Sequence, residues 1–113
     1  MEGTIPPSIG NLVLMQDLSF GNSPMNGTIP DLSNLTSLTS LSLTHSKVSG
    51  TIPEYIGTFT SLNFLSLMGN HLSGTIPLSF QQLRNINFLE LINGNSICNG
   101  CLNLIYRNQC FAN

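Results

Sequence analysis

Few side chains in this sequence could do acid–base or nucleophilic chemistry, and they do not form a catalytic pattern. Asp17, Asp31, His45 and His71 fall at places that share no spacing suited to a general acid and base. No serine stands in the glycine-flanked sequence of a nucleophile elbow. No glycine-rich phosphate loop is present either, because the glycines recur at one regular interval. We therefore do not expect an enzyme.

Thiols are concentrated at one end of the chain. Cys98, Cys101 and Cys110 all lie within the last sixteen residues, and neither histidine is near them. Three thiols are one ligand short of a structural zinc site, so neither a metal nor another cofactor is expected. The thiols and two acceptor sequons for N-linked glycosylation, at Asn26 and Asn34, favour an oxidising compartment.

The charge balance excludes two classes of partner. Five acidic and three basic side chains give a net charge of −2, so no basic surface is available for nucleic acid or an anionic membrane. No charged residue occurs between Glu54 and Arg84, yet polar residues interrupt this stretch too often for a membrane span. The length of 113 residues is that of one domain.

One four-residue phrase, GTIP, recurs along the chain. It begins at Gly3, Gly27, Gly50 and Gly74, at intervals of 24, 23 and 24 residues. When the chain is aligned on these glycines, apolar residues recur at relative positions 1, 4, 7, 9, 14 and 18 of each copy. In the second copy they are Leu35, Leu38, Leu41, Leu43, Val48 and Ile52. A repeat of this length indicates an array of stacked units.

The apolar residues at positions 7 and 9 have the spacing of a short strand with one buried face. These pairs are Leu18 and Phe20, Leu41 and Leu43, Leu65 and Leu67, and Leu89 and Leu91. One copy cannot bury its apolar face alone, so the copies must stack, with neighbouring strands roughly 4.8 Å apart. The proline of each GTIP turns the chain toward the convex side. The residues that close the core there are Ile9, Leu32, Ile56 and Phe80.

At these positions the sequence resembles the plant-type leucine-rich repeat family, whose pattern is LxxLxxLxLxxNxLxGxIPxxLxxLxx. The resemblance covers residues 3–93 and implies an α/β-type repeat solenoid of about four coils. Its expected parts are a parallel concave β-sheet, an irregular or 3-10 convex side, and a C-terminal cap that contains cysteines. The chain would then divide into leucine-rich repeats over residues 1–93, with no N-terminal cap, and a C-terminal cap over residues 94–113.

Position 12 of the family pattern is an asparagine that bonds the backbone of adjacent coils. Here the four copies have Ser23, Ser46, Asn70 and Gly94 at that place. Only one copy keeps the asparagine, so we expect a less rigid stack than the family norm. In the other turns, hydroxyls or water would have to bond the buried backbone groups.

The C-terminal end is expected to be closed by a disulfide. Cys98 stands where the glycine of a fifth GTIP is due, and the resemblance implies one cysteine pair in the cap. Cys98 with Cys110 is the first choice for this pair, and Cys101 with Cys110 is the second. The remaining thiol could join a second chain.

The N-terminal end is expected to be open. Ile5, Ile9, Leu12 and Met15 would border an exposed edge, which tends to recruit another strand or another molecule. The residues after Met1 also lack the basic start and the apolar run of a secretory signal. We expect either a fragment or processed form of a longer array, or self-association through this edge.

Outward-facing residues of the predicted strands form columns, with one residue from each copy. The columns are Asp17, Ser40, Phe64 and Phe88; Ser19, Ser42, Ser66 and Glu90; and Gly21, Thr44, Met68 and Ile92. Apolar side chains gather in the last two copies, and such clusters often mark a binding face, unless the C-terminal segment or a neighbouring molecule covers them. The predicted concave-face ligand-binding residues are Phe64, Phe88, Met68, Ile92, His45, Asn63, Asn87 and Glu90.

The threonine of each GTIP is expected to face outward on another surface. These residues are Thr4, Thr28, Thr51 and Thr75. Regular threonine arrays occur in ice-binding solenoids, some of which resemble this family. The row is only one residue wide, however, and threonine also favours strands in general. Ice binding is therefore the alternative hypothesis.

The resemblance implies a receptor-like, extracellular or secreted glycoprotein module without catalytic activity, similar to plant receptor ectodomains and to polygalacturonase-inhibiting proteins. Its partner would be a protein or peptide, bound on the concave sheet by protein–protein interaction. The alternatives are an ice-binding solenoid and a structural, self-assembling repeat protein.

Overall fold

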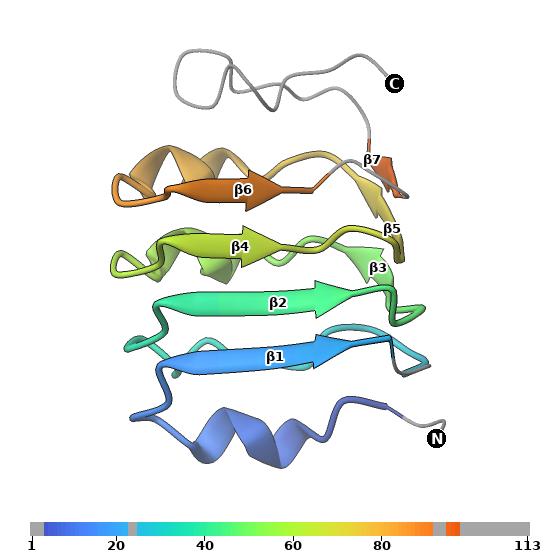
Figure 1. Ribbon diagram of the computed structural model, residues 1–113, viewed down its shortest axis with the longest axis horizontal. Helices are drawn as coiled ribbons and strands as arrows, with labels where there is room; N and C mark the ends of the chain where they lie inside the picture. Colours follow the sequence, from blue (N-terminus) through green and yellow to red (C-terminus); the bar gives the residue numbers. More distant parts are fainter. Residues whose placement is uncertain (1–3, 23–24, 92–94, 98–113) are drawn as a thin grey trace.

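The computed structural model describes residues 4–22, 25–91 and 95–97. Each repeat contributes one strand to a parallel sheet with the order β1-β2-β4-β6 (Figure 1). The strands are β1 (Asp17–Gly21), β2 (Ser40–Thr44), β4 (Phe64–Ser66) and β6 (Phe88–Glu90). Residues at the same place in successive copies are paired, as Leu18 is with Leu41 and Leu41 with Leu65. The predicted parallel sheet is confirmed.

The inner face of this sheet forms one side of a continuous apolar core. Leu41, Leu43, Leu65 and Leu67 are at most 1% exposed, whereas Phe20, the equivalent of Leu43 in the first copy, is half-buried. Burial of each such leucine contributes about 1.5–3 kcal/mol relative to an exposed position. From the opposite side the core is closed by Leu32, Ile56 and Phe80, all buried, and by the half-buried Ile9.

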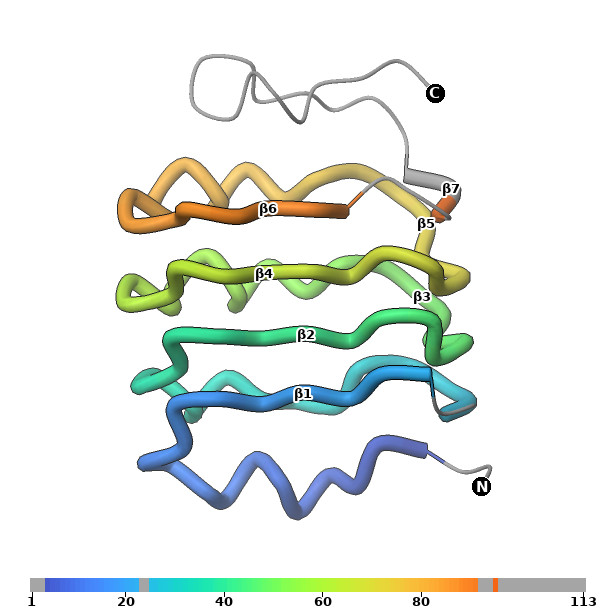
Figure 2. Tube along the Cα trace, viewed as in Figure 1, coloured from blue at the N-terminus to red at the C-terminus, as the bar shows by residue number. Residues whose placement is uncertain are grey.

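Short 3-10 helices lie behind the sheet in three of the copies (Figure 2). They are η1 (Pro7–Asn11), η2 (Glu54–Thr58) and η3 (Leu78–Gln82). Each begins directly after the proline of a GTIP, whose fixed backbone angle suits the turn. In the second copy the segment between Pro30 and Leu35 is one residue shorter than in the others. This segment, which the structure describes in full, has no 3-10 helix.

The glycines of GTIP are required by both backbone angle and space. Gly27, Gly50 and Gly74 have φ of 87°, 92° and 89°, a region that favours glycine. A Cβ atom on any of them would also lie only 3.0–3.2 Å from the threonine methyl of the preceding copy. Here the chain forms a second parallel sheet of β3 (Ser49–Thr51), β5 (His71–Gly74) and β7 (Ser96–Ile97).

Two asparagines, rather than one, bond the backbone of adjacent copies. Asn70 is 2% exposed, and its Oδ1 accepts from the backbone N–H groups of Ser46 and Val48 at 3.0 and 3.1 Å. Asn95 acts in the same way, because it donates to the Leu67 carbonyl at 2.7 Å and accepts from the Leu72 N–H at 2.9 Å. The expectation that only one copy keeps this asparagine was therefore wrong. The fourth copy has it one residue later than the alignment placed it.

Some predictions lie outside the described residues. These are most of the cap expected over residues 94–113, the disulfide alternatives among Cys98, Cys101 and Cys110, and the site residue Ile92. A search of the described ranges for a helix long and apolar enough to cross a membrane found none.

Candidate functional site

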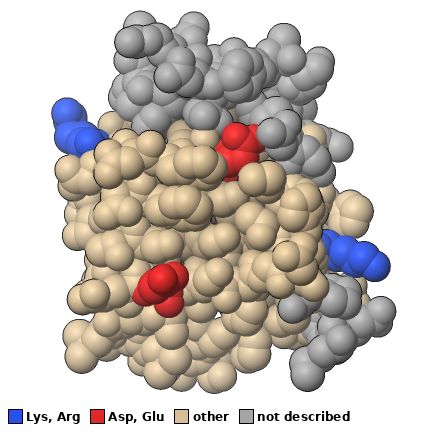
Figure 3. Space-filling view, in the orientation of Figure 1, with Lys and Arg blue, Asp and Glu red and all other residues tan. Residues whose placement is uncertain are grey.

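The outer face of the four-stranded sheet carries most of the predicted site residues. Phe64 is paired with Phe88, and Ser66 with Glu90, in the register of β4 and β6. Leu65 and Leu89 between them are buried, so the alternate residues face outward. This face is largely uncharged: Figure 3 shows two small acidic patches on it, and the basic side chains in view project at its edges. Such a surface offers apolar and polar contacts more than electrostatic attraction.

Phe64 and Phe88 form a stacked aromatic pair on this face. Their ring centroids are 4.7 Å apart and the ring planes differ by 9°. Phe88 remains 43% exposed, and Phe64 is half-buried. Offset stacking of this kind contributes about 0.5–1.5 kcal/mol beyond burial. The pair therefore presents an apolar aromatic surface to solvent.

Ser66 lies between Phe64 and the half-buried Met68 on the outward side of β4. Ser66 is 2% exposed, and its Oγ has no hydrogen-bond partner among the residues that the structure describes. A buried hydroxyl without a partner costs free energy, and such groups are often found at functional sites. The sequence pattern did not single out Ser66, because a serine in a polar column gives no sign that its neighbours will bury it.

Polar residues flank the aromatic pair. Asn63 and Asn87 are exposed, directly before β4 and β6, and the Asn87 backbone N–H donates to the Asn63 carbonyl at 2.8 Å. Glu90 is half-buried in β6. His45 follows β2 in a left-handed conformation with φ of 51°. Its imidazole lies over Gly69, where a Cβ atom would be 2.2 Å from the ring Nδ1, so any larger residue at 69 would displace the imidazole.

The GTIP threonines form a separate exposed surface. Thr4, Thr28, Thr51 and Thr75 are all exposed. Their row is staggered, because the backbone pairs Thr28 with Ser49 and Thr51 with Ser73. Thr4, Thr28 and Thr51 thus each lie beside a serine or glycine of the next copy.

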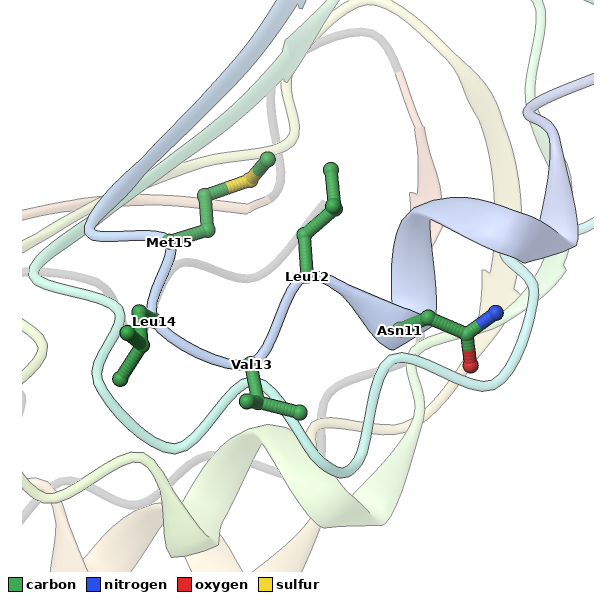
Figure 4. A pocket seen from close by; sticks show the side chains of 5 residues that line it. All are labelled: Asn11, Leu12, Val13, Leu14 and Met15. Carbon is green, nitrogen blue, oxygen red and sulfur yellow. The ribbon is translucent and has the colours of Figure 1, made fainter.

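The apolar residues exposed at the N-terminal end agree only in part with those expected. Ile5 is only 2% exposed and belongs to the core, so its predicted place at an exposed edge was wrong. Leu12, Val13 and Leu14 are 52%, 49% and 82% exposed. Residues 11–15 line a hollow of about 430 Å³, in which Leu12 and Met15 point to one side of the loop and Val13 and Leu14 to the other (Figure 4). Self-association through this end stays a prediction.

The residues considered for catalysis are placed on separate elements. Asp17 begins β1, Asp31 follows Pro30, His45 follows β2, and His71 begins β5. Over the described ranges, no group of three His, Cys, Asp or Glu side chains could hold a metal ion.

Both glycosylation sequons lie at the surface. Asn26 and Thr28 of the first sequon are exposed, as are Asn34 and Thr36 of the second. Accessibility is compatible with modification at both asparagines, and glycosylation itself stays a prediction.

Comparison with known proteins points to one repeat family. The family model described as Leucine Rich Repeat matches residues 37–59 and 61–83. A search of curated protein sequences gave no match.

Several solved structures are similar in fold and sequence. A plant ice-binding protein is 36% identical over 85% of this chain, with a TM-score of 0.81. The ectodomain of the Arabidopsis thaliana receptor kinase GASSHO1/SCHENGEN3, solved in complex with Casparian strip integrity factor 2, is 32% identical over 85%, with a TM-score of 0.81. The PEPR1–AtPEP1 structure is 38% identical over 84%, with a TM-score of 0.79. This chain spans 31%, 12% and 13% of the lengths of those three chains.

Proposed function

Because this chain is a plant-type leucine-rich repeat protein, we propose that it is an extracellular, non-enzymatic recognition module that binds a protein or peptide. The proposed site is the outer, concave face of the four-stranded sheet. The observation that carries this assignment is the stacked pair of Phe64 and Phe88, since a rigid aromatic surface loses little entropy on binding.

The surroundings of the aromatic pair support a peptide as ligand. Met68 extends the apolar surface along β4, and the exposed Asn63 and Asn87 can bond main-chain amides at its rim. Ser66 lies on the same side of β4 as Phe64, and its Oγ, which has no hydrogen-bond partner within the described part of the chain, could bond a ligand carbonyl or N–H group. Two similar structures are the plant peptide hormone receptor RGFR1 in complex with RGF2 and the Arabidopsis receptor kinase HAESA in complex with the peptide hormone IDA. They favour a peptide as the ligand here.

Substitution of the aromatic pair tests this proposal. Peptides are selected from a random displayed library on the immobilised chain, and their dissociation constants are measured by calorimetry. Phe88→Ser is expected to weaken binding by about thirtyfold, because a central aromatic anchor contributes about 2 kcal/mol or more. The matched control is Leu78→Ser on η3, which removes a 69% exposed apolar side chain far from the sheet.

Leu78→Ser should keep the thermal unfolding midpoint close to that of the parent chain. Phe88→Ser should lower the midpoint by several degrees, because it also loses about 0.5–1.5 kcal/mol of ring stacking, but the variant should stay folded. Equal losses of affinity in Phe88→Ser and Leu78→Ser, or no loss in either, would refute the site assignment.

As the alternative function we propose ice binding through the GTIP threonines. It is supported by the similarity to a plant ice-binding protein and by the exposure of all four threonines. The double change Thr51→Val and Thr75→Val removes two hydroxyls and keeps the Thr51 methyl that lies beside Gly74. Thermal hysteresis and inhibition of ice recrystallisation should then fall markedly. This alternative would be excluded if the parent chain showed neither thermal hysteresis nor inhibition of ice recrystallisation, or if the double variant were as active as the parent.

A further inference from the structure

The shortened second repeat leaves a groove on the side of the molecule behind the sheet. Between η1 and η2 there is no 3-10 helix in the described segment 30–35, and the groove there has a volume of about 530 Å³. Its apolar lining comes from Ile29, Pro30 and Pro53. Ile29 is half-buried, whereas Ile52 at the same place in the next copy is 3% exposed. The groove therefore lies beside the shortened segment.

Tyr55 of η2 reaches across this gap to the second repeat. Its phenol hydroxyl donates to the Pro30 carbonyl at 2.6 Å, and its oxygen interacts with the Leu32 backbone N–H, so the proton is engaged and one acceptor position of the oxygen stays open to a ligand donor. Burial is the main reason that the pKa of Tyr55 lies above its ordinary value, which keeps the phenol protonated. The ring thus forms a fixed wall of the groove.

The polar groups of the groove are mainly hydrogen-bond acceptors. Asp31 is exposed there, and its Oδ1 accepts from the Ser33 backbone N–H at 3.0 Å. Bonds from Ser33 hold the pKa of Asp31 below its ordinary value, so the carboxylate is charged at neutral pH and keeps lone pairs free for a ligand. The hydroxyls of Thr28 and Thr51 can donate or accept. Within the described residues, no basic side chain lines the groove.

We propose that this groove binds an arginine side chain of a partner protein or peptide. The aliphatic part of arginine would pack on the isoleucine and proline lining, and its guanidinium would donate to the Asp31 carboxylate and the Tyr55 oxygen. Arginine fits better than lysine, since its planar, weakly hydrated head has five donors and stacks on aromatic rings. The volume lies within the range of roughly 300–1,000 Å³ that is usual for small-ligand sites.

This site lies away from the outer face of the sheet and does not depend on the aromatic pair. The test uses N-acetyl-L-arginine methylamide as the probe. Its binding is measured from the shifts of backbone amide signals in two-dimensional NMR. The matched probe is the citrulline analogue, which has the same shape without the charge. We expect the largest shifts around Thr28, Asp31 and Tyr55, and citrulline should bind about threefold to fivefold more weakly, as for an exposed charge pair.

Two variants separate the Asp31 carboxylate from the general charge of the protein. Asp31→Asn keeps an oxygen for the Ser33 N–H and should lower the affinity for the arginine probe to that of the citrulline probe. Glu54→Gln removes an exposed carboxylate that does not line the groove and should leave the affinity unchanged. The amide spectrum of each variant shows whether it is folded.

Equal affinities for the two probes would overturn the proposal, as would unchanged binding in Asp31→Asn. Shifts confined to the amides of β4 and β6 would also overturn it, because they would place the probe on the outer face of the sheet. Phe88→Ser should leave the arginine probe's affinity unchanged, so failure here and failure of the proposed peptide site can be distinguished.

Discussion

Replacement of Asn70 by alanine is expected to lower the free energy of unfolding by about 3–4 kcal/mol, because several buried backbone groups would lose their partner at once. Asn70 Oδ1 accepts two backbone N–H bonds from the turn after β2. Its Nδ2 donates to the carbonyls of Leu43, Leu67 and Met68. The loss should be visible as a lower urea midpoint with an unchanged slope, followed by circular dichroism.

Two other asparagines provide the controls. Asn63→Ala removes an exposed side chain and should change stability by no more than about 0.5 kcal/mol. Asn95 is partly buried, and its side chain bonds to Leu67, Leu72 and Leu91. The loss of unfolding free energy in Asn95→Ala should therefore lie between the losses in Asn63→Ala and Asn70→Ala. A cost for Asn70→Ala no larger than that for Asn63→Ala would show that water replaces these bonds without loss.

The sheet could be predicted because its signal is repeated in every copy. Leucines two residues apart, such as Leu41 and Leu43, must face the same side of a strand, and the constant interval puts equivalent strands beside one another. The outward-facing residues on either side of these leucines are then also placed beside their equivalents in the next copy. For this reason the contact between Phe64 and Phe88 could be anticipated as a column, although the near-parallel stacking of their rings could not.

Departures from the repeat could not be predicted in the same way. The fourth copy lacks a following GTIP, so counting twelve places leads to Gly94, whereas the backbone bonds to Leu67 and Leu72 are made by Asn95. Only the positions of the donor and acceptor groups in three dimensions decide between two adjacent residues.

Burial at the ends of the array is a second limit of sequence reasoning. Ile5 and Leu12 are both apolar residues near the start of the chain, yet Ile5 is buried and Leu12 is half exposed. The difference arises because Ile5 packs into the core cluster, while Leu12 lies in the loop after η1. Likewise, the sequence shows the shorter interval from Gly27 to Gly50, but it does not show that the Tyr55 hydroxyl bonds the Pro30 carbonyl of the shortened repeat.

Removal of the Phe80 side chain is expected to be among the most damaging single changes in the core. Phe80 is 0% exposed and is among the largest fully buried side chains. Phe80→Ala should lower the free energy of unfolding by about 3–5 kcal/mol, since it loses buried apolar area and leaves a cavity. Leu78→Ala on the same 3-10 helix is the matched control and should change stability by no more than about 0.5 kcal/mol, because Leu78 is 69% exposed.

The extent of unfolding in Phe80→Ala also shows how cooperative the array is. In a solenoid each repeat contacts only its neighbours, so a defect in η3 acts first on η2, which lies beside it. So short an array has little stability to spare in any single repeat, and we expect it to unfold as one unit. Amide hydrogen exchange should therefore accelerate in β1 and β2 as much as in β6. Faster exchange in β6 alone would mean that the last repeat opens locally, and that the core beneath the aromatic pair is less stable than the rest.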